Sequence, residues 1–153
     1  MGKVHFREAS QEKDSGLLFE MINESYLPDD GFFQEGLRIA KFEEMKGLFE
    51  MGKFFLMVEE VDEEKGEEKG KEEVVGCAHC TLNGKINQLK RMKFKLLTIK
   101  QSCKGRGLAS KLINFCHEHA REVGCSFGDI DVVSVKPWLI KVYEKYGYRV
   151  IGE

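Results

Sequence analysis

The 153-residue chain lacks strong net charge, long apolar runs and an even set of cysteines. Its formal net charge of −2 gives no global attraction to nucleic acid or to an anionic membrane. No apolar run approaches the ~20 residues that span a bilayer, and the N-terminus has no signal-peptide core. Five cysteines without a secretory signal predict free thiols in a reducing compartment. We therefore expect residues 1–153 to form one domain. We expect this domain to be cytoplasmic, with the nucleus as a second location, and to bind neither membrane nor nucleic acid.

The most informative stretch is a glycine-containing loop, Lys104–Ala109, because of the elements predicted on either side of it. The apolar run Phe94–Ile99 predicts a strand, and the amphipathic segment Leu108–Val123 predicts a helix. Gly105 and Gly107 let the backbone approach a ligand closely. The N–H groups in the first turn of a helix have no partners within that helix. The stretch therefore predicts a strand, a loop and a helix that together present hydrogen-bond donors.

Phosphate oxygens are the ligand that this loop fits best. The positive end of the helix dipole and the charges of Lys104 and Arg106 add to the free N–H groups. A nucleotide P-loop needs a Gly-Lys-Ser/Thr ending, whereas this loop ends in Gly-Leu-Ala. A dinucleotide fingerprint needs a third glycine or an alanine at the position of Ser110. We expect the residues from Lys104 to Ser110 to hold phosphates.

A second pattern lies at residues 137–148. Pro137 suits the first position of a helix, and Gly147 suits the position just past its end. On spacing alone, Tyr143 is either a core side chain or a functional group, and both interpretations stay open. The residues on one face of the predicted helix are Leu139, Val142, Tyr143 and Tyr146.

Together, the two patterns resemble the GNAT superfamily of N-acetyltransferases. The loop is similar to its coenzyme A signature Arg/Gln-x-x-Gly-x-Gly/Ala, and residues 143–148 are similar to its Tyr-Glu-Lys-x-Gly-Phe/Tyr segment. The order of the predicted elements is also similar, from Val4 to Gly152. Two positions depart from the pattern. Lys104 keeps the charge of the first position without the guanidinium fork, and Lys136 stands where the family often has an asparagine.

The resemblance implies an α+β fold, the acyl-CoA N-acyltransferase fold. Helices flank a mixed, mostly antiparallel sheet in which the parallel fourth and fifth strands splay apart. The charged run Asp62–Glu73 has no apolar anchor and is expected to be a mobile hairpin loop. The expected strands are Val4–Phe6, Lys53–Val61, Val74–Leu82, Arg91–Lys100, Ile130–Val135 and Tyr148–Gly152. The expected helices are Asp14–Tyr26, Phe42–Gly52, Leu108–Val123 and Pro137–Tyr146.

The predicted fourth strand changes its alternation partway along. Met92, Phe94 and Leu96 alternate with basic residues, but the apolar set continues at Leu97 and Ile99 on the opposite parity. Either a β-bulge near Leu96 and Leu97 or full burial of the strand's end explains this slip. The resemblance favours the bulge, and it implies that the pantetheine arm of coenzyme A bonds to backbone groups freed there. Those groups would belong to Leu97, Thr98 and Ile99.

The reaction implied by the resemblance is acetyl transfer from acetyl-coenzyme A to an amine, either a small molecule or a protein amine. An amine with a pKa near ~10.4 must lose a proton before it attacks. The backbone N–H of Leu97 is expected to stabilise the oxyanion, and Tyr143 is expected to protonate the leaving thiolate. His79 and Asp131 are candidates for the general base. The expected cofactor-binding residues are Leu97, Thr98, Ile99, Lys104, Gly105, Arg106, Gly107, Leu108, Ala109 and Ser110.

No metal is expected in this chemistry. Cys77 and Cys80 form a lone Cys-x-x-Cys, but residues three apart in a strand point to opposite faces, and no second ligand pair follows. His117 and His119 are two apart on a helix, so they cannot share a metal ion as placed.

Two other functions stay open. An acyl-coenzyme A binding or sensing protein without catalysis would keep the loop and not depend on Tyr143. A nicotinamide-nucleotide oxidoreductase would use the turn Gly105–Ser110 and prefer a nicotinamide cofactor. Many relatives also add one more strand where this chain has Glu153. That strand is absent, lies beyond the sequence given, or comes from a second copy in a homodimer.

Overall fold

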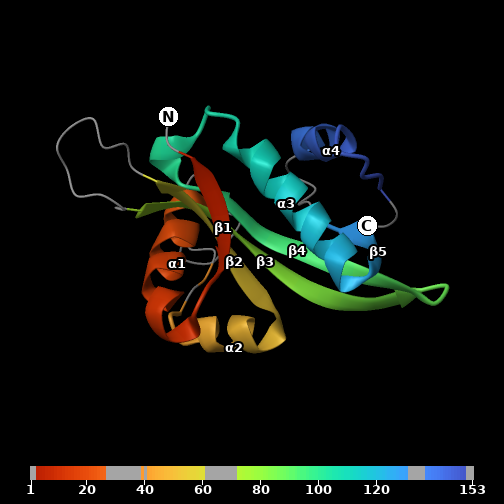
Figure 1. Ribbon diagram of the computed structural model, residues 1–153, viewed down its shortest axis with the longest axis horizontal. Helices are drawn as coiled ribbons and strands as arrows, with labels where there is room; N and C mark the ends of the chain where they lie inside the picture. The colour runs from red at the N-terminus through yellow and green to blue at the C-terminus, as the bar shows by residue number, and fades with distance from the viewer. Residues whose placement is uncertain (1–2, 27–38, 40, 61–71, 131–136, 151–153) are drawn as a thin grey trace.

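A computed structural model of the protein describes residues 3–26, 39, 41–60, 72–130 and 137–150. Figure 1 shows the elements in chain order. Among the described residues, no helix is both long enough and apolar enough to cross a membrane. The strands are β1 (Val4–Glu8), β2 (Lys53–Glu60), β3 (Glu72–Ile86), β4 (Leu89–Ile99) and β5 (Cys125–Asp129). The helices are α1 (Gln11–Tyr26), α2 (Glu44–Met51), α3 (Leu108–Val123), α4 (Pro137–Glu144) and the short 3₁₀ helix η4 (Gln101–Cys103).

The five strands form one mixed sheet in the order β1-β2-β3-β4-β5. Neighbours from β1 to β4 are antiparallel. β5 runs parallel to β4, because α3 crosses over between them. The expected fold class, a mostly antiparallel sheet with parallel fourth and fifth strands and flanking helices, is therefore confirmed.

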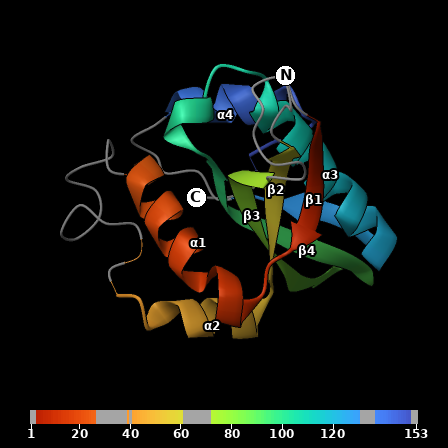
Figure 2. The same ribbon diagram turned by 60° about the vertical axis from the view of Figure 1, so that its left-hand side comes forward.

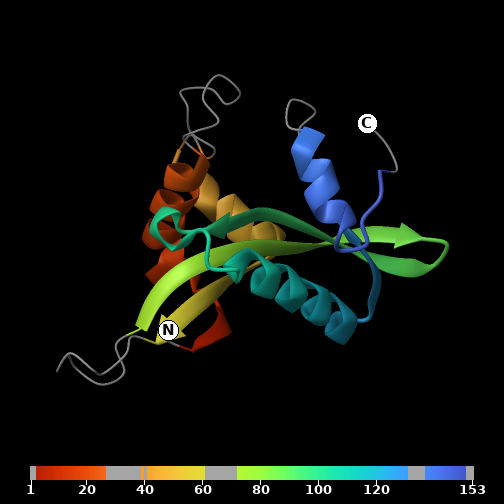
Figure 3. The same ribbon diagram turned by 90° about the horizontal axis from the view of Figure 1, so that it is seen from above.

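Helices cover both faces of the sheet and create two separate cores. In Figures 2 and 3 the sheet lies between two layers of helices: α1 and α2 cover one face, and α3 covers the other. Cys77 packs in the α1/α2 core and Cys80 packs in the α3 core, as expected for residues three apart in a strand. Large side chains of the α1/α2 core include Leu18, Ile22, Phe54 and Leu56. Those of the α3 core include Met57, Phe94, Leu108 and Leu112.

β4 contains the predicted bulge. Cys77 pairs with Thr98 and His79 pairs with Lys95, so one residue of β3 lies opposite two residues of β4. Leu96, the first of these two, has a φ of 55°, which is in the left-handed region that a leucine rarely adopts. The bulge therefore explains the change of alternation that the sequence shows.

Side chains around the bulge hold it in place. The carbonyl oxygen of Leu96 accepts a hydrogen bond from Thr98 Oγ1 at 2.8 Å and from Cys77 Sγ at 3.7 Å. The Leu96 side chain packs in the α1/α2 core, whereas Leu97 packs against the α3 core. These contacts offset the cost of the left-handed backbone, which is about 1–2 kcal/mol for a residue with a side chain.

The fifth strand is a correction to the sequence prediction. β5 spans Cys125–Asp129, whereas Ile130–Val135 was expected to form this strand. Residues 131–136 lie outside the described ranges. The segment Cys-Ser-Phe-Gly-Asp has little apolar alternation, so periodicity gives no sign that it is a strand.

Contacts with β4 make this weak sequence a strand. A Cβ atom at Gly128 would lie 2.7 Å from Cε2 of Phe94, so only a glycine lets the ring pack this closely. Asp129 accepts two hydrogen bonds from the guanidinium of Arg91, both at 3.0 Å. The C-terminal part of β5 is therefore held by tertiary partners rather than by local propensity.

The end of α4 follows the sequence prediction. Gly147 has a φ of 95°, and its N–H donates to the Glu144 carbonyl at 3.1 Å. The N–H of Tyr148 donates to the Tyr143 carbonyl at 3.3 Å. These two bonds form a Schellman motif, in which glycine adopts the left-handed conformation that ends a helix.

Two further expectations need correction. Tyr148–Val150 are not in a strand, and residues 151–153 of the expected strand Tyr148–Gly152 lie outside the described part. Tyr148 instead directs its hydroxyl to Nε2 of His117 on α3, at 2.7 Å. The expected loop over residues 62–73 is shorter, because Glu72 and Glu73 already pair with β2, while residues 61–71 lie outside the described ranges.

The junction between α2 and β2 packs directly on β3. A Cβ atom at Gly52 would lie 2.3 Å from the backbone oxygen of Cys80 and 2.3 Å from Thr81 Oγ1. The backbone oxygen belongs to a paired strand and cannot move aside easily. Glycine is therefore required here for space rather than for backbone conformation, since its φ of −173° is ordinary extended backbone.

We expect Gly52→Ala to lower the free energy of unfolding by about 1–3 kcal/mol, because the new methyl group overpacks this junction. Denaturant unfolding measures the change. Gly16→Ala on α1 is the matched control, because Gly16 is exposed and has nothing within 4 Å of the added Cβ. It should stabilise the protein by up to ~1 kcal/mol through helix propensity. Unchanged or raised stability of Gly52→Ala would contradict the close packing.

Candidate functional site

The loop between β4 and α3 has the open backbone that the sequence predicts. Gly105 and Gly107 have φ values of 85° and 77°, in the left-handed region that favours glycine. Gly107 is the N-cap of α3, and no side chain caps the first turn of this helix. Leu108 anchors the helix start in the α3 core, whereas Lys104 and Ala109 are exposed. The first N–H groups of α3 are therefore available to an anion.

Arg106 does not point out of this loop. Its guanidinium binds the carboxylate of Glu59 on β2, with 3.2 Å between Nη1 and Oε1 and a second hydrogen bond between Nη2 and Oε2. The hydrogen bond to Glu59 raises the pKa of Arg106. Lys104 thus carries the exposed positive charge of the loop.

Among the described residues, β5 leaves the part of β4 next to this loop unpaired. Within the described residues, β5 pairs with β4 only over Lys90–Lys93. The predicted pantetheine-binding residues Leu97, Thr98 and Ile99 follow the last of these pairs. They lead through η4 directly into the glycine loop, so the fold makes the open strand edge and the loop continuous.

Tyr143 lies in the last turn of α4, beside the α3 side of the sheet. Burial raises its pKa, and Cys116 of α3 adds to this shift. Its ring meets that of Tyr148 edge to face, with centroids 5.9 Å apart. Its hydroxyl makes no hydrogen bond to a described residue. A protonated phenol that no such bond engages is suited to donate its proton.

His79 holds α2 against the sheet. It is fully buried, and its Nε2 donates to the carbonyl oxygen of Leu48 at 2.6 Å. Burial lowers the pKa of His79, so the ring is neutral and carries its proton on Nε2. Its Nδ1 lies 3.4 Å from Thr81 Oγ1. These contacts give His79 a structural role in place of the general-base role considered from the sequence.

Two further titratable side chains on the described part of α3 and η4 have structural surroundings. His119 packs on Phe55, with ring centroids 4.6 Å apart. Cys103 is buried in the α3 core beneath the loop. Asp131, the second candidate for a general base, and Lys136 lie outside the described residues.

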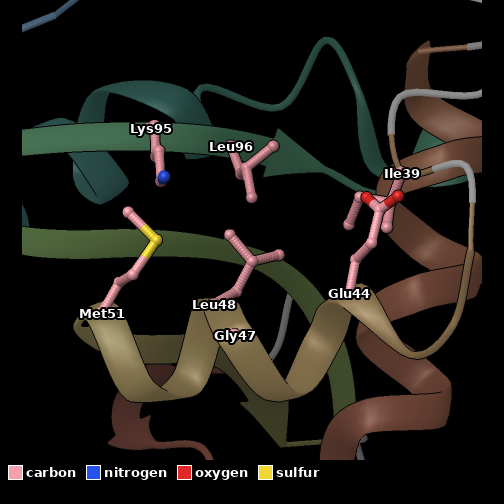
Figure 4. Close-up of a pocket in the computed structure, with 7 residues that line it drawn as sticks. All are labelled: Ile39, Glu44, Gly47, Leu48, Met51, Lys95 and Leu96. Atoms are coloured by element: carbon pink, nitrogen blue, oxygen red, sulfur yellow. The ribbon is translucent and has the colours of Figure 1, made fainter.

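A pocket of about 340 Å³ lies between α2 and β4 on the α1/α2 face (Figure 4). Glu44 lies near Ile39 at one end of it, and Lys95 lies near Met51 at the other. Leu96, the bulge residue, forms part of the wall, so the pocket adjoins the open end of β4. The lining residues are Ile39, Glu44, Gly47, Leu48, Met51, Lys95 and Leu96.

Sequence reasoning missed two features of this region, the pocket and the pairing of Arg106 with Glu59. Neither can be located from the local sequence. Glu59 lies 47 positions before Arg106. Its one sequence cue is that it is a carboxylate whose nearest neighbours on the same strand face are apolar. Such a residue predicts a buried partner of opposite charge, but periodicity does not say which one.

Residues 18–148 match the model of the acetyltransferase (GNAT) family. The matched range includes the glycine loop, Tyr143 and every residue that lines the pocket. The match thus covers the predicted cofactor-binding residues from Leu97 to Ser110.

One named relative and two solved structures are also similar to this chain. The acetyltransferase Atu2258 of Agrobacterium fabrum is 36% identical over 58 residues, which are 38% of this chain and 41% of that protein. A transcriptional regulator from Bacillus halodurans has a TM-score of 0.71 at 19% identity, covering 99% of this chain and 96% of its own. A predicted acetyltransferase with acetyl-CoA, from Clostridium acetobutylicum, has a TM-score of 0.67 at 16% identity, covering 99% and 93%. At these identities the two structures show the fold alone.

Proposed function

The chain belongs to the acetyltransferase (GNAT) family, and from this premise we propose that it transfers the acetyl group of acetyl-coenzyme A to a primary amine. One observation carries the proposal: among the described residues, β5 leaves the edge of β4 beyond Lys93 unpaired, and this edge leads through η4 and the glycine loop to the first turn of α3. A ligand with an amide-bearing arm and a pyrophosphate matches both surfaces at once, because strand edges bond amides and helix N-termini bond phosphates.

The donor is assigned to these two surfaces. The backbone of Lys104–Ser110 binds the pyrophosphate, with Lys104 contributing charge. The backbone groups of Leu97–Ile99 bind the pantetheine arm. The Clostridium acetobutylicum structure, whose fold this chain shares, contains acetyl-CoA, which supports this donor.

In the proposed reaction a neutral amine nitrogen attacks the carbonyl carbon of the thioester. A C–N bond forms, and the carbonyl oxygen becomes an oxyanion that the Leu97 N–H stabilises. The oxyanion collapses and breaks the C–S bond. Tyr143 gives its proton to the departing sulfur, and the acetylated nitrogen loses one proton to solvent. The tyrosinate then takes a proton from solvent and becomes a phenol again. The products are an amide and free coenzyme A.

The acceptor is assigned to the pocket between α2 and β4. Its volume of about 340 Å³ is within the range of small-ligand sites. Leu96 joins the pocket to the bulge, so an acceptor seated there approaches the residue that precedes the proposed oxyanion donor. Glu44 is a lining carboxylate that attracts a cationic amine before it loses its proton.

Calorimetric titration of the purified protein with acetyl-coenzyme A tests the donor. We expect saturable binding in the micromolar range and no binding of NADH under the same conditions. Preference for NADH would contradict the proposal in favour of an oxidoreductase.

Release of free thiol in the presence of a panel of amines tests the transfer. Thiol release that requires both an amine and acetyl-coenzyme A is the expected result. Tight binding of acetyl-coenzyme A with no thiol release for any small amine, peptide N-terminus or lysine peptide would favour a non-catalytic binding protein.

A further inference from the structure

The carboxylate of Glu59 lies beneath the glycine loop and holds it through Arg106. Glu59 is on β2 and faces the α3 side of the sheet, where only 13% of its side chain is exposed. The Arg106 side chain is 29% exposed, and its two terminal nitrogens each bond one carboxylate oxygen. Such a two-point contact fixes the orientation of the guanidinium as well as its distance.

A nearly buried carboxylate next to a phosphate-binding loop is unfavourable unless it is neutralised. Its charge would repel the phosphates, and its desolvation would have no compensation. Arg106 removes both costs in the geometry observed. Arg106 also stands between Gly105 and Gly107, which by themselves leave the loop backbone free to take many conformations.

We propose that Glu59 is a positioning residue for acetyl-coenzyme A. By binding Arg106 from beneath, it holds the loop so that its N–H groups face the pyrophosphate. Arg106 then acts on the ligand through the backbone rather than by contacting phosphate. This inference rests on the proposed function, because it presupposes that the loop binds the pyrophosphate.

The two possible roles of Arg106 predict opposite results for Glu59→Gln. If Arg106 anchors the loop, loss of the carboxylate loosens the loop and weakens acetyl-coenzyme A binding. If Arg106 is instead a phosphate ligand that Glu59 competes for, loss of the carboxylate releases it and strengthens binding. The sign of the change in Kd therefore separates the two roles.

The test measures the Kd for acetyl-coenzyme A in Glu59→Gln, Arg106→Gln and the double variant. We expect each single substitution to raise Kd about five- to tenfold. The Kd of the double variant should equal that of either single variant, because all three variants lose the same contact between Glu59 and Arg106. The value of kcat at saturating donor should stay within about twofold, since Tyr143 is untouched.

Glu73→Gln is the matched control. Glu73 is the register partner of Glu59 on β3, and it pairs with Lys100 at 2.9 Å. Its substitution removes the same charge and one ion pair at the same end of the sheet but leaves Arg106 alone. We expect a Kd within about twofold of the unmodified protein, because an exposed ion pair contributes little.

Amide hydrogen exchange of residues 104–110 in the unliganded protein gives a second readout. Faster exchange there in Glu59→Gln, with no change in the rest of α3, supports the anchoring role. Tighter or unchanged binding by Glu59→Gln, or additive effects in the double variant, would overturn it. If the unmodified protein does not bind acetyl-coenzyme A, the proposed function is wrong. The rate of amide hydrogen exchange in residues 104–110 then still shows whether Glu59 anchors the loop.

Discussion

Tyr143→Phe is expected to lower kcat about 100-fold while the Kd for acetyl-coenzyme A stays within about twofold, as for the loss of a general acid. The substitution removes only the hydroxyl, which makes no hydrogen bond to a described residue. Packing of the ring on Tyr148 should therefore survive. Steady-state kinetics together with calorimetric binding measure the two quantities separately.

Tyr146→Phe is the matched control, because it removes the same atom from a partly buried tyrosine three residues away. Its kcat should be unchanged within about twofold. Burial raises the pKa of Tyr143, so its proton is retained at neutral pH and is lost only above the ordinary tyrosine range. The activity of the unmodified protein should accordingly not fall through loss of this acid below about pH 10. Equal kcat for Tyr143→Phe and the control would remove Tyr143 from the mechanism.

Gly107→Trp is expected to weaken acetyl-coenzyme A binding at least about 100-fold, because two or more charge-assisted hydrogen bonds would be lost. The indole would occupy the space in front of the first turn of α3, where the pyrophosphate is proposed to bind. Among the described residues, none apart from its chain neighbours lies within 4 Å of a Cβ at Gly107, so the position has room for a side chain.

Gly124→Trp controls for the backbone strain of this substitution. Gly124 caps the other end of the same helix with a φ of 91°, and it too has nothing within 4 Å of an added Cβ. Both variants should lose about 1–2 kcal/mol of stability from the left-handed backbone. Only Gly107→Trp should lose the ligand. Comparable loss of binding in both variants would mean that α3 as a whole, not its N-terminus, supports the site.

The sequence predicts well those parts of the fold that depend on a few consecutive residues. Because side-chain alternation has a strict period of two, the slip from Leu96 to Leu97 indicates either a bulge or a fully buried strand end, the resemblance favours the bulge, and the structure has the bulge. The glycines at 107, 124 and 147 mark helix ends because each takes a positive φ at a helix boundary. These signals depend on local geometry, so they hold without knowledge of the tertiary structure.

The parts that sequence reasoning misplaced depend on distant partners. β5 is a strand because Gly128 admits the Phe94 ring and Asp129 binds Arg91, none of which periodicity detects. The resemblance implied a strand beginning at Tyr148, but Tyr148 is not in a strand and its hydroxyl bonds to His117 on α3. The roles assigned to Tyr143 and to the Leu97 N–H remain predictions for the kinetics above.

The bulge also bears on how the range of acceptors could change during evolution. Leu96 lines the pocket, but its backbone is left-handed and its carbonyl is held by Thr98 and Cys77, so substitutions there disturb the strand itself. Leu48 and Met51 line the opposite wall from α2, and Met51 is 58% exposed. The exposed side chain of Met51 can change size at little cost to stability, whereas Leu48 also packs against the α1/α2 core. Substitutions that change the proposed acceptor pocket should therefore accumulate on α2, whereas the bulge in β4 should be retained.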